Sequence, residues 1–342
     1  MKKIVKQVVG IDVAQKELVV CLGKMYDDWC PSVYAHKTFV NTEKGFKALV
    51  VWVKEKTEDS TTIRFVMEAT GVYHEGLAYF LDAAQHEVSI VLPNKISNYF
   101  KTLEVRTITD KTAAETITLF GLERKLDCWQ KPKEVFKKLR QLTREKDQLV
   151  QERTAIKNQL HAEQAEAEPN KKSVQRSKER VKLLDKQELE IQQEVTILLN
   201  QDEQIQQVVR LICSLTGVGL LTSAIVLGET NGFELIRNRR QLASYAGFDI
   251  KEKQSGTSVK GKPRISKKGN RHLRKAMHLP ALCAIRYDER FKSIFARLVA
   301  KHGIKMKAAV AVQRKMLEMI FTLFKTGKPY DKNYLMLTNE AK

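Results

Sequence analysis

The first part of the chain alternates between apolar runs typical of β-strands and amphipathic segments typical of helices. Residues 8–13 form a β-branched run with Asp12 near its end, and after a four-residue polar break a second such run ends at Val20. This pattern predicts two strands of a hairpin. Burying an unpaired carboxylate costs about 2 kcal/mol or more, so Asp12 is expected to contact a metal, a nucleotide or a basic partner. Capping of the hairpin turn is the alternative.

Further strands and helices follow in the same part of the chain. We expect strands at 32–41, 63–67 and 88–92, and helices from Thr42, around 77–81 and from Thr109. Three strands in a row, then helix and strand in alternation, predict a mixed sheet with helices on its faces.

Three carboxylates are placed at the ends of these elements. Asp12 and Glu68 end apolar strands, and Asp110 begins a helix, which it or Thr109 can cap. Hard oxygen ligands of this kind suit Mg²⁺ or Mn²⁺. Two such ions about 3.5 to 4 Å apart can clamp the attacking and the leaving oxygen when a phosphodiester is exchanged. The acids therefore predict a divalent-metal site, with helix capping as the alternative for Asp110.

From about Lys131 the sequence becomes long, charged and helix-forming. Leucines and isoleucines from Leu139 to Leu160 keep an imperfect heptad rhythm, Glu168–Asn170 interrupts it, and a second such helix runs from about Ser173 to Leu198. We expect an antiparallel helical hairpin or a dimerising coiled coil, with a solvated spacer as the alternative. The remainder to about Lys325 is predicted to be mostly helical.

Composition points to a polyanionic partner. The 342 residues contain 60 Lys and Arg against 40 Asp and Glu, a formal charge of +20, and nucleic acid is the natural partner for such a surface. Five scattered cysteines indicate neither a disulfide framework nor a zinc site. Without a signal-peptide pattern or a run of about 18 apolar residues, a soluble intracellular protein with no membrane contact is expected.

The densest basic segment is residues 251–275, interleaved with glycines. We expect an adaptable loop that lies along a phosphate backbone and makes binding salt-dependent. Ser255 lies within it, where positive charge would favour a nucleophile towards phosphorus, although most loop serines are turn residues. The predicted nucleic-acid contacts are Lys251, Lys253, Lys260, Lys262, Arg264, Lys267, Lys268, Arg271, Arg274 and Lys275.

Several short motifs follow one another along the chain. They are Gly10-Ile11-Asp12-Val13, Glu68-Ala69-Thr70-Gly71, Leu92-Pro93-Asn94, Thr109-Asp110-Lys111, Ser214-Leu215-Thr216-Gly217, Tyr245-Ala246-Gly247, Gln254-Ser255-Gly256, Ile265-Ser266-Lys267-Lys268-Gly269-Asn270 and Arg314-Lys315-Met316-Leu317. Together they resemble the DEDD transposases of insertion sequences, relatives of the Piv DNA invertase that include bridge-RNA-guided recombinases. The resemblance covers nearly the whole chain.

The resemblance implies an α/β plus α architecture in three domains. These are a RuvC-like, ribonuclease-H-type mixed-sheet domain at 1–128, a helical coiled-coil connector at 129–200, and a mostly α transposase domain at 201–335. Asp12, Glu68 and Asp110 match the first three acids, and Ser255 matches the serine that forms a phosphoserine link to DNA.

The resemblance also implies partners and a location. They are target and donor double-stranded DNA, a structured guide RNA that pairs with both, and further copies of the chain in a dimer or tetramer whose active site joins the acids of one subunit to the serine of another. The expected location is the bacterial cytoplasm, in association with the nucleoid.

Ala113 departs from the family pattern. The fourth acid belongs three residues after the third, and residues 110 and 113 share a helix face, so an acid at 113 would point with Asp110 at the same metal. Glu115 faces away. We therefore expect impaired metal binding and catalysis, with nucleic-acid binding retained.

Three other interpretations stay open on the sequence alone. An actin-like or sugar-kinase-like ATP-binding domain also opens with an Asp on a glycine-flanked hairpin, but it needs later glycine-rich phosphate loops. A nucleic-acid-binding protein without chemistry is compatible with Ala113. The third is a RuvC-like nuclease for Holliday junctions, or an invertase, that uses the acids and needs no guide RNA.

Overall fold

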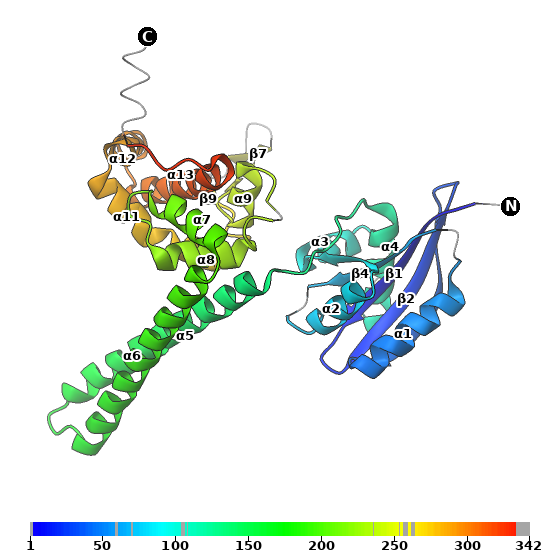
Figure 1. Cartoon of the computed structure of the whole chain (residues 1–342), viewed down its shortest axis with the longest axis horizontal. Helices are drawn as coiled ribbons and strands as arrows, with labels where there is room; N and C mark the ends of the chain where they lie inside the picture. Colours follow the sequence, from blue (N-terminus) through cyan, green and yellow to red (C-terminus); the bar gives the residue numbers. More distant parts are fainter. Residues whose placement is uncertain are drawn as a thin grey trace, which may run out of the picture. The chain divides into compact units, whose positions relative to one another are not determined.

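The chain folds into two compact units, residues 1–131 and 132–342, in a computed structural model (Figure 1). The structure describes residues 3–58, 61–69, 71–103, 107, 109–234, 236–252, 254, 255, 259, 260 and 264–332, with only the backbone of 254, 255, 259 and 260. In these residues, no helix is both long and apolar enough to cross a membrane.

The first unit is built on a five-stranded sheet in the order β3-β2-β1-β4-β5. The first three strands pair antiparallel, whereas β4 lies parallel to β1 and β5 parallel to β4. The strands are β1 (Ile4–Val13), β2 (Glu17–Tyr26), β3 (Pro31–Val40), β4 (Ile63–Glu68) and β5 (Glu87–Val91). All five predicted strands are therefore present.

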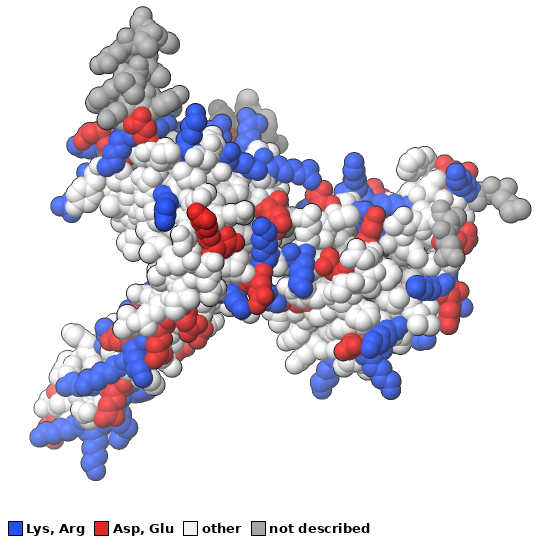
Figure 2. All heavy atoms as spheres, in the orientation of Figure 1, with Lys and Arg blue, Asp and Glu red and all other residues white. Residues whose placement is uncertain are grey.

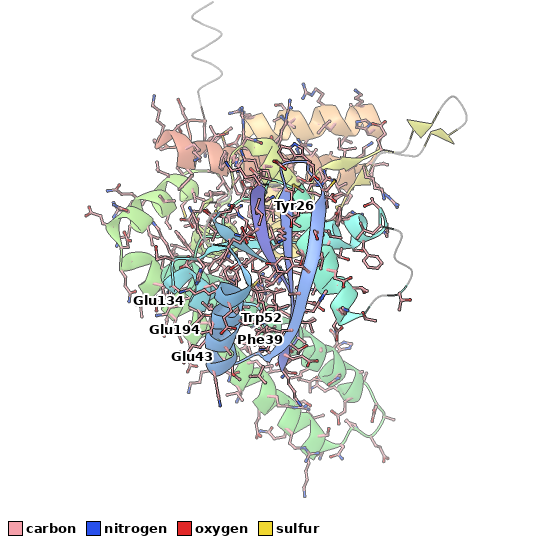
Figure 3. The ribbon with its side chains drawn as sticks, turned by 90° about the vertical axis from the view of Figure 1, so that its right-hand side faces the viewer. Tyr26, Phe39, Glu43, Trp52, Glu134 and Glu194 are labelled. Carbon is pink, nitrogen blue, oxygen red and sulfur yellow. The ribbon has the colours of Figure 1, made fainter. Side chains whose placement is uncertain are left out.

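Helices cover both faces of this sheet and bury one hydrophobic core on each. The helices are α1 (Glu43–Lys56), α2 (Glu75–Ala83), α3 (Pro93–Phe100) and α4 (Asp110–Glu123). On the first face, Trp52 of α1 packs against Phe39 of β3 with ring centroids 5.7 Å apart (Figure 3). The sequence pattern did not predict α3, which packs with α4 on the other face.

The strand order and the two helical layers confirm the expected fold class, a mixed sheet of ribonuclease-H type followed by a mostly helical region.

Glycine at position 10 allows α4 to lie directly against β1. A Cβ atom at Gly10 would lie 2.2 Å from the Oγ1 of Thr118 and 2.5 Å from its backbone nitrogen. Real Cβ atoms do not approach that closely, so a larger residue would force the helix away from the strand. The Thr118 hydroxyl donates hydrogen bonds to the carbonyls of Ala114, at 2.8 Å, and Cys21, at 3.2 Å, which ties the helix to β2 as well.

Both ends of α4 are fixed. At the N-terminus, Thr109 and Thr112 form a reciprocal capping box, each side chain accepting from the other's backbone N–H. At the C-terminus, the Lys6 ammonium donates to the carbonyls of Gly121, Leu122 and Arg124 at 2.6 to 2.9 Å. A cation there also complements the helix dipole. The contacts of Thr118 with β1 and β2 and those of Lys6 thus set the position of α4 on the sheet, and the capping box fixes where the helix begins.

The second unit is helical apart from four two-residue strands among its described residues. Its helices are α5 (Glu134–Gln164), α6 (Lys171–Asn200), α7 (Glu203–Cys213), α8 (Leu220–Thr230), α9 (Arg239–Tyr245), α10 (Arg271–Ala276), α11 (His278–Tyr287), α12 (Glu289–His302) and α13 (Lys305–Thr326). The long helices α5 and α6 pack side by side as a hairpin (Figure 1).

The base of this hairpin shares a core with the C-terminal helices. Leu139 of α5 and Ile191 and Val195 of α6 are buried in the same cluster as residues of α7, α8 and α13. Farther out, Lys146 pairs with Glu188 at 2.6 Å and Arg153 with Asp185 at 2.6 Å. The hairpin and the C-terminal helices therefore form one packed body.

We predict that G10A destabilises the first unit by about 1–3 kcal/mol, because the added methyl overlaps the backbone of α4. Chemical denaturation measures this change. G76A is the matched control, since a Cβ there meets Phe46 only at 3.6 Å, an ordinary contact. Equal unfolding free energies for the two variants would contradict this account of α4.

Candidate active site

The strand register brings Asp12 and Glu68 to the same end of the sheet. Ile11 of β1 is paired with Met67 of β4 in parallel, so the next residue on each strand is a carboxylate. Side chains alternate across a strand, and Asp12 therefore shares the face of Gly10, which is the face covered by α4. Both side chains are half-buried.

Asp110 reaches this place from the helix. It lies one turn before Ala114, whose carbonyl is next to Gly10. Four residues of an α-helix advance about 6 Å along its axis, and two residues of a strand advance about 6.6 Å. Asp110 is consequently displaced along α4 by about as much as Asp12 is displaced from Gly10 along β1.

The three carboxylates interact electrostatically. Burial, with the negative charges of Asp110 and Glu68, raises the pKa of Asp12 from 3.8 to about 6, against a weaker opposing hydrogen bond from the Val13 backbone. Like charges that share a site disfavour ionisation in this way, and titration near neutral pH is typical of functional sites. The structure thus places Asp110 and Glu68 close enough to Asp12 for their negative charges to add to the effect of burial on its pKa.

The two capping alternatives do not account for these acids. The β1–β2 turn is closed by a backbone hydrogen bond from Ala14 to Glu17 at 3.0 Å, and the cap of α4 is Thr109. Neither Asp12 nor Asp110 is therefore explained by capping.

The three carboxylates fit a hard divalent cation by the chemistry of their oxygen atoms, but their side chains are not gathered into a metal cage. Among the described residues, no three His, Cys, Asp or Glu side chains are grouped closely enough to hold a metal ion. Ala113, half-buried on the face of Asp110, adds no ligand where an acid would be placed.

The basic segment differs from the predicted loop. Within its described part, Ile250–Lys251 pairs with Arg264–Ile265, and Gln254–Ser255 pairs with Val259–Lys260, both antiparallel. Arg271, Arg274 and Lys275 lie on α10 instead of a loop, because the Asn270 side chain accepts from the N–H groups of His272 and Leu273 and begins that helix.

The predicted phosphate contacts fall into three groups. Lys251, Arg264, Lys267, Lys268 and Arg271 are exposed. Lys253 and Lys262, and the side chains of Lys260 and Ser255, lie outside the described residues.

Arg274 and Lys275 make contacts within the protein and lie on a helix, not on the predicted loop. The Arg274 guanidinium donates to the carbonyls of Ala246 at 2.7 Å and Gly269 at 3.1 Å, and Lys275 pairs with Asp147. The Lys275 side chain is 58% exposed, and the contact of both residues with nucleic acid stays a prediction.

A buried carboxylate anchors the end of this segment, and the sequence pattern did not identify it. The Glu229 side chain is 1% exposed and forms two parallel bonds with Arg144, at 2.7 and 2.9 Å. It also accepts from Asn270 at 2.6 Å. Burial alone would raise the pKa of Glu229, but the hydrogen bonds from Arg144 and Asn270 outweigh it and lower that pKa.

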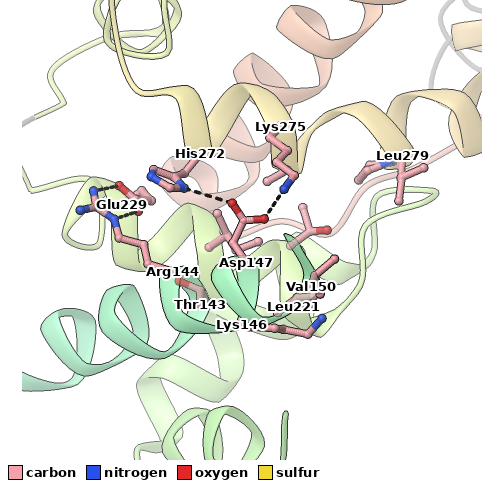
Figure 4. Close-up of a pocket in the computed structure, with 14 residues that line it drawn as sticks. Thr143, Arg144, Lys146, Asp147, Val150, Leu221, Glu229, His272, Lys275 and Leu279 are labelled. Carbon is pink, nitrogen blue, oxygen red and sulfur yellow. Dashed lines mark hydrogen bonds and ion pairs between the residues drawn. The ribbon is translucent and has the colours of Figure 1, made fainter. Parts of the chain in front are cut away.

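Beside Glu229 is a cavity of about 250 Å³ between α5, α8, α10 and α11 (Figure 4). Asp147 points into it towards Lys275 and His272, and Leu279 lines the far side. Its charged side chains are mutually paired. Glu229 could be found only from the structure, because its partners lie 85 and 41 residues away.

Two transposase sequence profiles match the chain. One describes DEDD transposases and covers residues 9–169, and the other describes transposases of the IS116/IS110/IS902 family and covers residues 209–296. The protein is therefore a DEDD transposase, an enzyme that recombines DNA. Within that class, the chain belongs to the IS110 family.

Two curated relatives agree with this assignment. The pilin gene-inverting proteins of Moraxella lacunata and Moraxella bovis are 28% and 27% identical over 96% of this chain and 98% of theirs. RuvC of Thermus thermophilus, solved with a Holliday junction substrate, is 11% identical with a TM-score of 0.28, over 36% of this chain and 99% of that one. The fold class itself follows from the strand order and helix layers.

We predict that D12N stabilises the protein at neutral pH while it removes recombination. A raised carboxyl pKa means that folded-state stability falls as pH rises between about 4 and 6, because the unfolded chain gives up its proton first. D12N should raise the free energy of unfolding at pH 7 by roughly 1–2 kcal/mol, a range that allows for the partial exposure of the carboxylate, and flatten the pH dependence in that window.

Urea denaturation from pH 4 to pH 7 measures the free energy of unfolding and its dependence on pH. E17Q, at an exposed acid of the same hairpin, is the control and should leave the profile unchanged. A D12N variant less stable than the parent at pH 7 would refute the proposed charge repulsion.

Proposed function

We propose that this transposase cuts and rejoins DNA with a divalent ion at Asp12, Glu68 and Asp110 and with Ser255 as the nucleophile. The observation that carries the proposal is the strand register that puts Asp12 and Glu68 at one end of the sheet, where burial and the charges of Asp110 and Glu68 raise the pKa of Asp12. A cation bound there would offset those negative charges. Mg²⁺ or Mn²⁺ suits such oxygen ligands.

The three acids have distinct tasks in this proposal. Asp12 and Glu68, on adjacent strands, would hold the ion, and Asp110 would complete the set from the helix. When bound, the ion would supply positive charge to the phosphate undergoing exchange. The capping box fixes the first turn of α4, on which the Asp110 backbone lies.

Ser255 is proposed to attack the DNA phosphorus. The Oγ–P bond would form as the bond from phosphorus to one deoxyribose oxygen breaks, and the serine proton would pass to the leaving oxygen through solvent or a nearby base. Attack by a deoxyribose hydroxyl on the phosphoserine then restores a phosphodiester and frees the serine. Support comes from the family motif around Ser255 and the exposed cations of the same segment, Lys251 and Arg264.

We also propose that a structured RNA selects target and donor DNA and that the chain acts as a homo-oligomer, a dimer or tetramer. Delegating sequence choice to base pairing leaves the protein to hold duplex shape and backbone, which suits its diffuse excess of 20 positive charges. Lys and Arg side chains are spread over both units (Figure 2). The exposed Leu183 and Ile197 of α6 offer apolar surface for association.

Ala113 is proposed to impair this activity. Its backbone N–H donates to the Thr109 carbonyl at 2.8 Å, so the residue is in regular helix and its Cβ direction is that of an acid at the same position. A fourth carboxylate could therefore join the site without any change of fold.

We predict that A113D raises the rate of DNA strand exchange by at least about 10-fold, since loss of even an outer partner of a metal site costs that much. A plasmid recombination assay with Mg²⁺ or Mn²⁺ measures the rate. A113D/S255A should then lose both exchange and the covalent protein–DNA species seen on denaturing gels, whereas A113D/S293A, at an exposed serine of α12, should keep them.

Two results would oppose the proposal. A parent chain as fast as A113D would show that Ala113 does not impair catalysis. Cleavage that survives in A113D/S255A would assign the chemistry to the acids alone, as in a junction nuclease.

We predict that the purified protein carries one discrete structured RNA. Extraction, ribonuclease treatment and sequencing identify it, and its loops should match the DNA that the protein recombines. Random fragments, or no RNA, would indicate an invertase that selects DNA without a guide. The control is the same purification in high salt, which should remove weakly held polyanions.

A further inference from the structure

A small polar hollow of about 110 Å³ lies between α9, α12 and α13 in the second unit. Three cationic side chains line it, one from each helix: Arg239, Arg290 and Lys315. Glu318 and Thr322 of α13 lie between them, and three apolar side chains complete the lining. None of the three cations belongs to the basic segment at 251–275.

The hollow carries an excess of positive charge. Its one carboxylate, Glu318, already accepts a hydrogen bond from Arg314 at 2.8 Å. In the part of the chain that the structure describes, neither Arg239 nor Lys315 forms an ion pair. Asp288 is buried and lies with Arg290 beside Tyr330. When Arg314 and Asp288 are counted with the lining residues, the hollow still has two more cations than carboxylates.

The larger cavity beside Glu229 shows the contrast. There Arg144 pairs with Glu229, Lys146 with Glu188 and Lys275 with Asp147, so its charges are balanced within the protein. Cations gathered from three helices without matching carboxylates repel one another unless an anion joins them.

Helix polarity points the same way. Arg239 begins α9 and Arg290 lies in the first turn of α12. The helix dipole disfavours a cation in a first turn, so these arginines are placed against the electrostatic preference of their own helices. Their positions are explained if they bind a ligand of negative charge.

We propose that Arg239, Arg290 and Lys315 bind a phosphodiester group of nucleic acid at this hollow. The cations supply the charge, the planar guanidinium groups of the arginines match phosphate oxygens, and the size admits one such group. This inference rests on the nucleic-acid binding in the proposed function and adds a contact on a surface other than the segment that holds Ser255. Duplex DNA and structured RNA both present the group.

The test is binding of R239Q/K315Q to a 30-base-pair duplex and, separately, to a folded RNA across a range of salt. Loss of the contact to this one phosphate should reduce the slope of log K against log salt by about 0.9 for duplex DNA. Both positions are exposed, and removing a cation from the start of α9 does not weaken that helix, so the variant should fold. Thermal unfolding confirms this.

K305Q/K307Q is the matched control, with the same loss of charge at exposed lysines of α13 that do not line the hollow. A larger slope change in R239Q/K315Q than in this control supports the site, and the polymer that shows it is the source of the phosphate. Equal changes in the two variants overturn the site while leaving nucleic-acid binding intact. A parent protein that binds neither polymer overturns the site and the proposed function together.

Discussion

The contact of α4 with β1 at Gly10 is the constraint on which the acidic site depends. Because no Cβ separates them, the helix lies against the strand, and Asp110 arrives beside Asp12 and Glu68. Capping at Thr109 and the Lys6 contacts then hold the helix along its length. The fold thereby holds Asp12 half-buried and near two further negative charges, which is unfavourable for stability and useful for binding a cation.

In the second unit, the important carboxylate is one that is paired inside the protein. Glu229 is buried but fully engaged, with Arg144 of α5 on one side and Asn270, the cap of α10, on the other. Removing one partner of such a pair is costly because it leaves a buried charge without compensation. Glu229 thus fixes one end of the basic segment to the connector helix, while Lys267 and Lys268 nearby remain exposed.

The positive charges of the second unit therefore form three sets that differ in their surroundings. Some are structural, as Arg274 is at the backbone carbonyls of Ala246 and Gly269. Others lie exposed in the basic segment, and a third set is gathered in the hollow that Arg239 helps to line. Sequence density alone predicted only the segment, because the hollow collects its cations from three separate helices.

The sequence by itself determined the five strands, the two long helices, the acids at strand ends and the family, because period-two and heptad patterns and short motifs are local; whether those helices form a hairpin was left open and was decided by the structure. The sequence did not reveal α3, since Pro93 can end a strand or begin a helix equally well. Only the tertiary structure decided that the charges of Asp110 and Glu68 act on Asp12, that Arg274 serves packing and that Glu229 anchors the basic segment. Each of these depends on residues far apart in the chain, whose distances are set by strand register and helix packing and not by any local pattern.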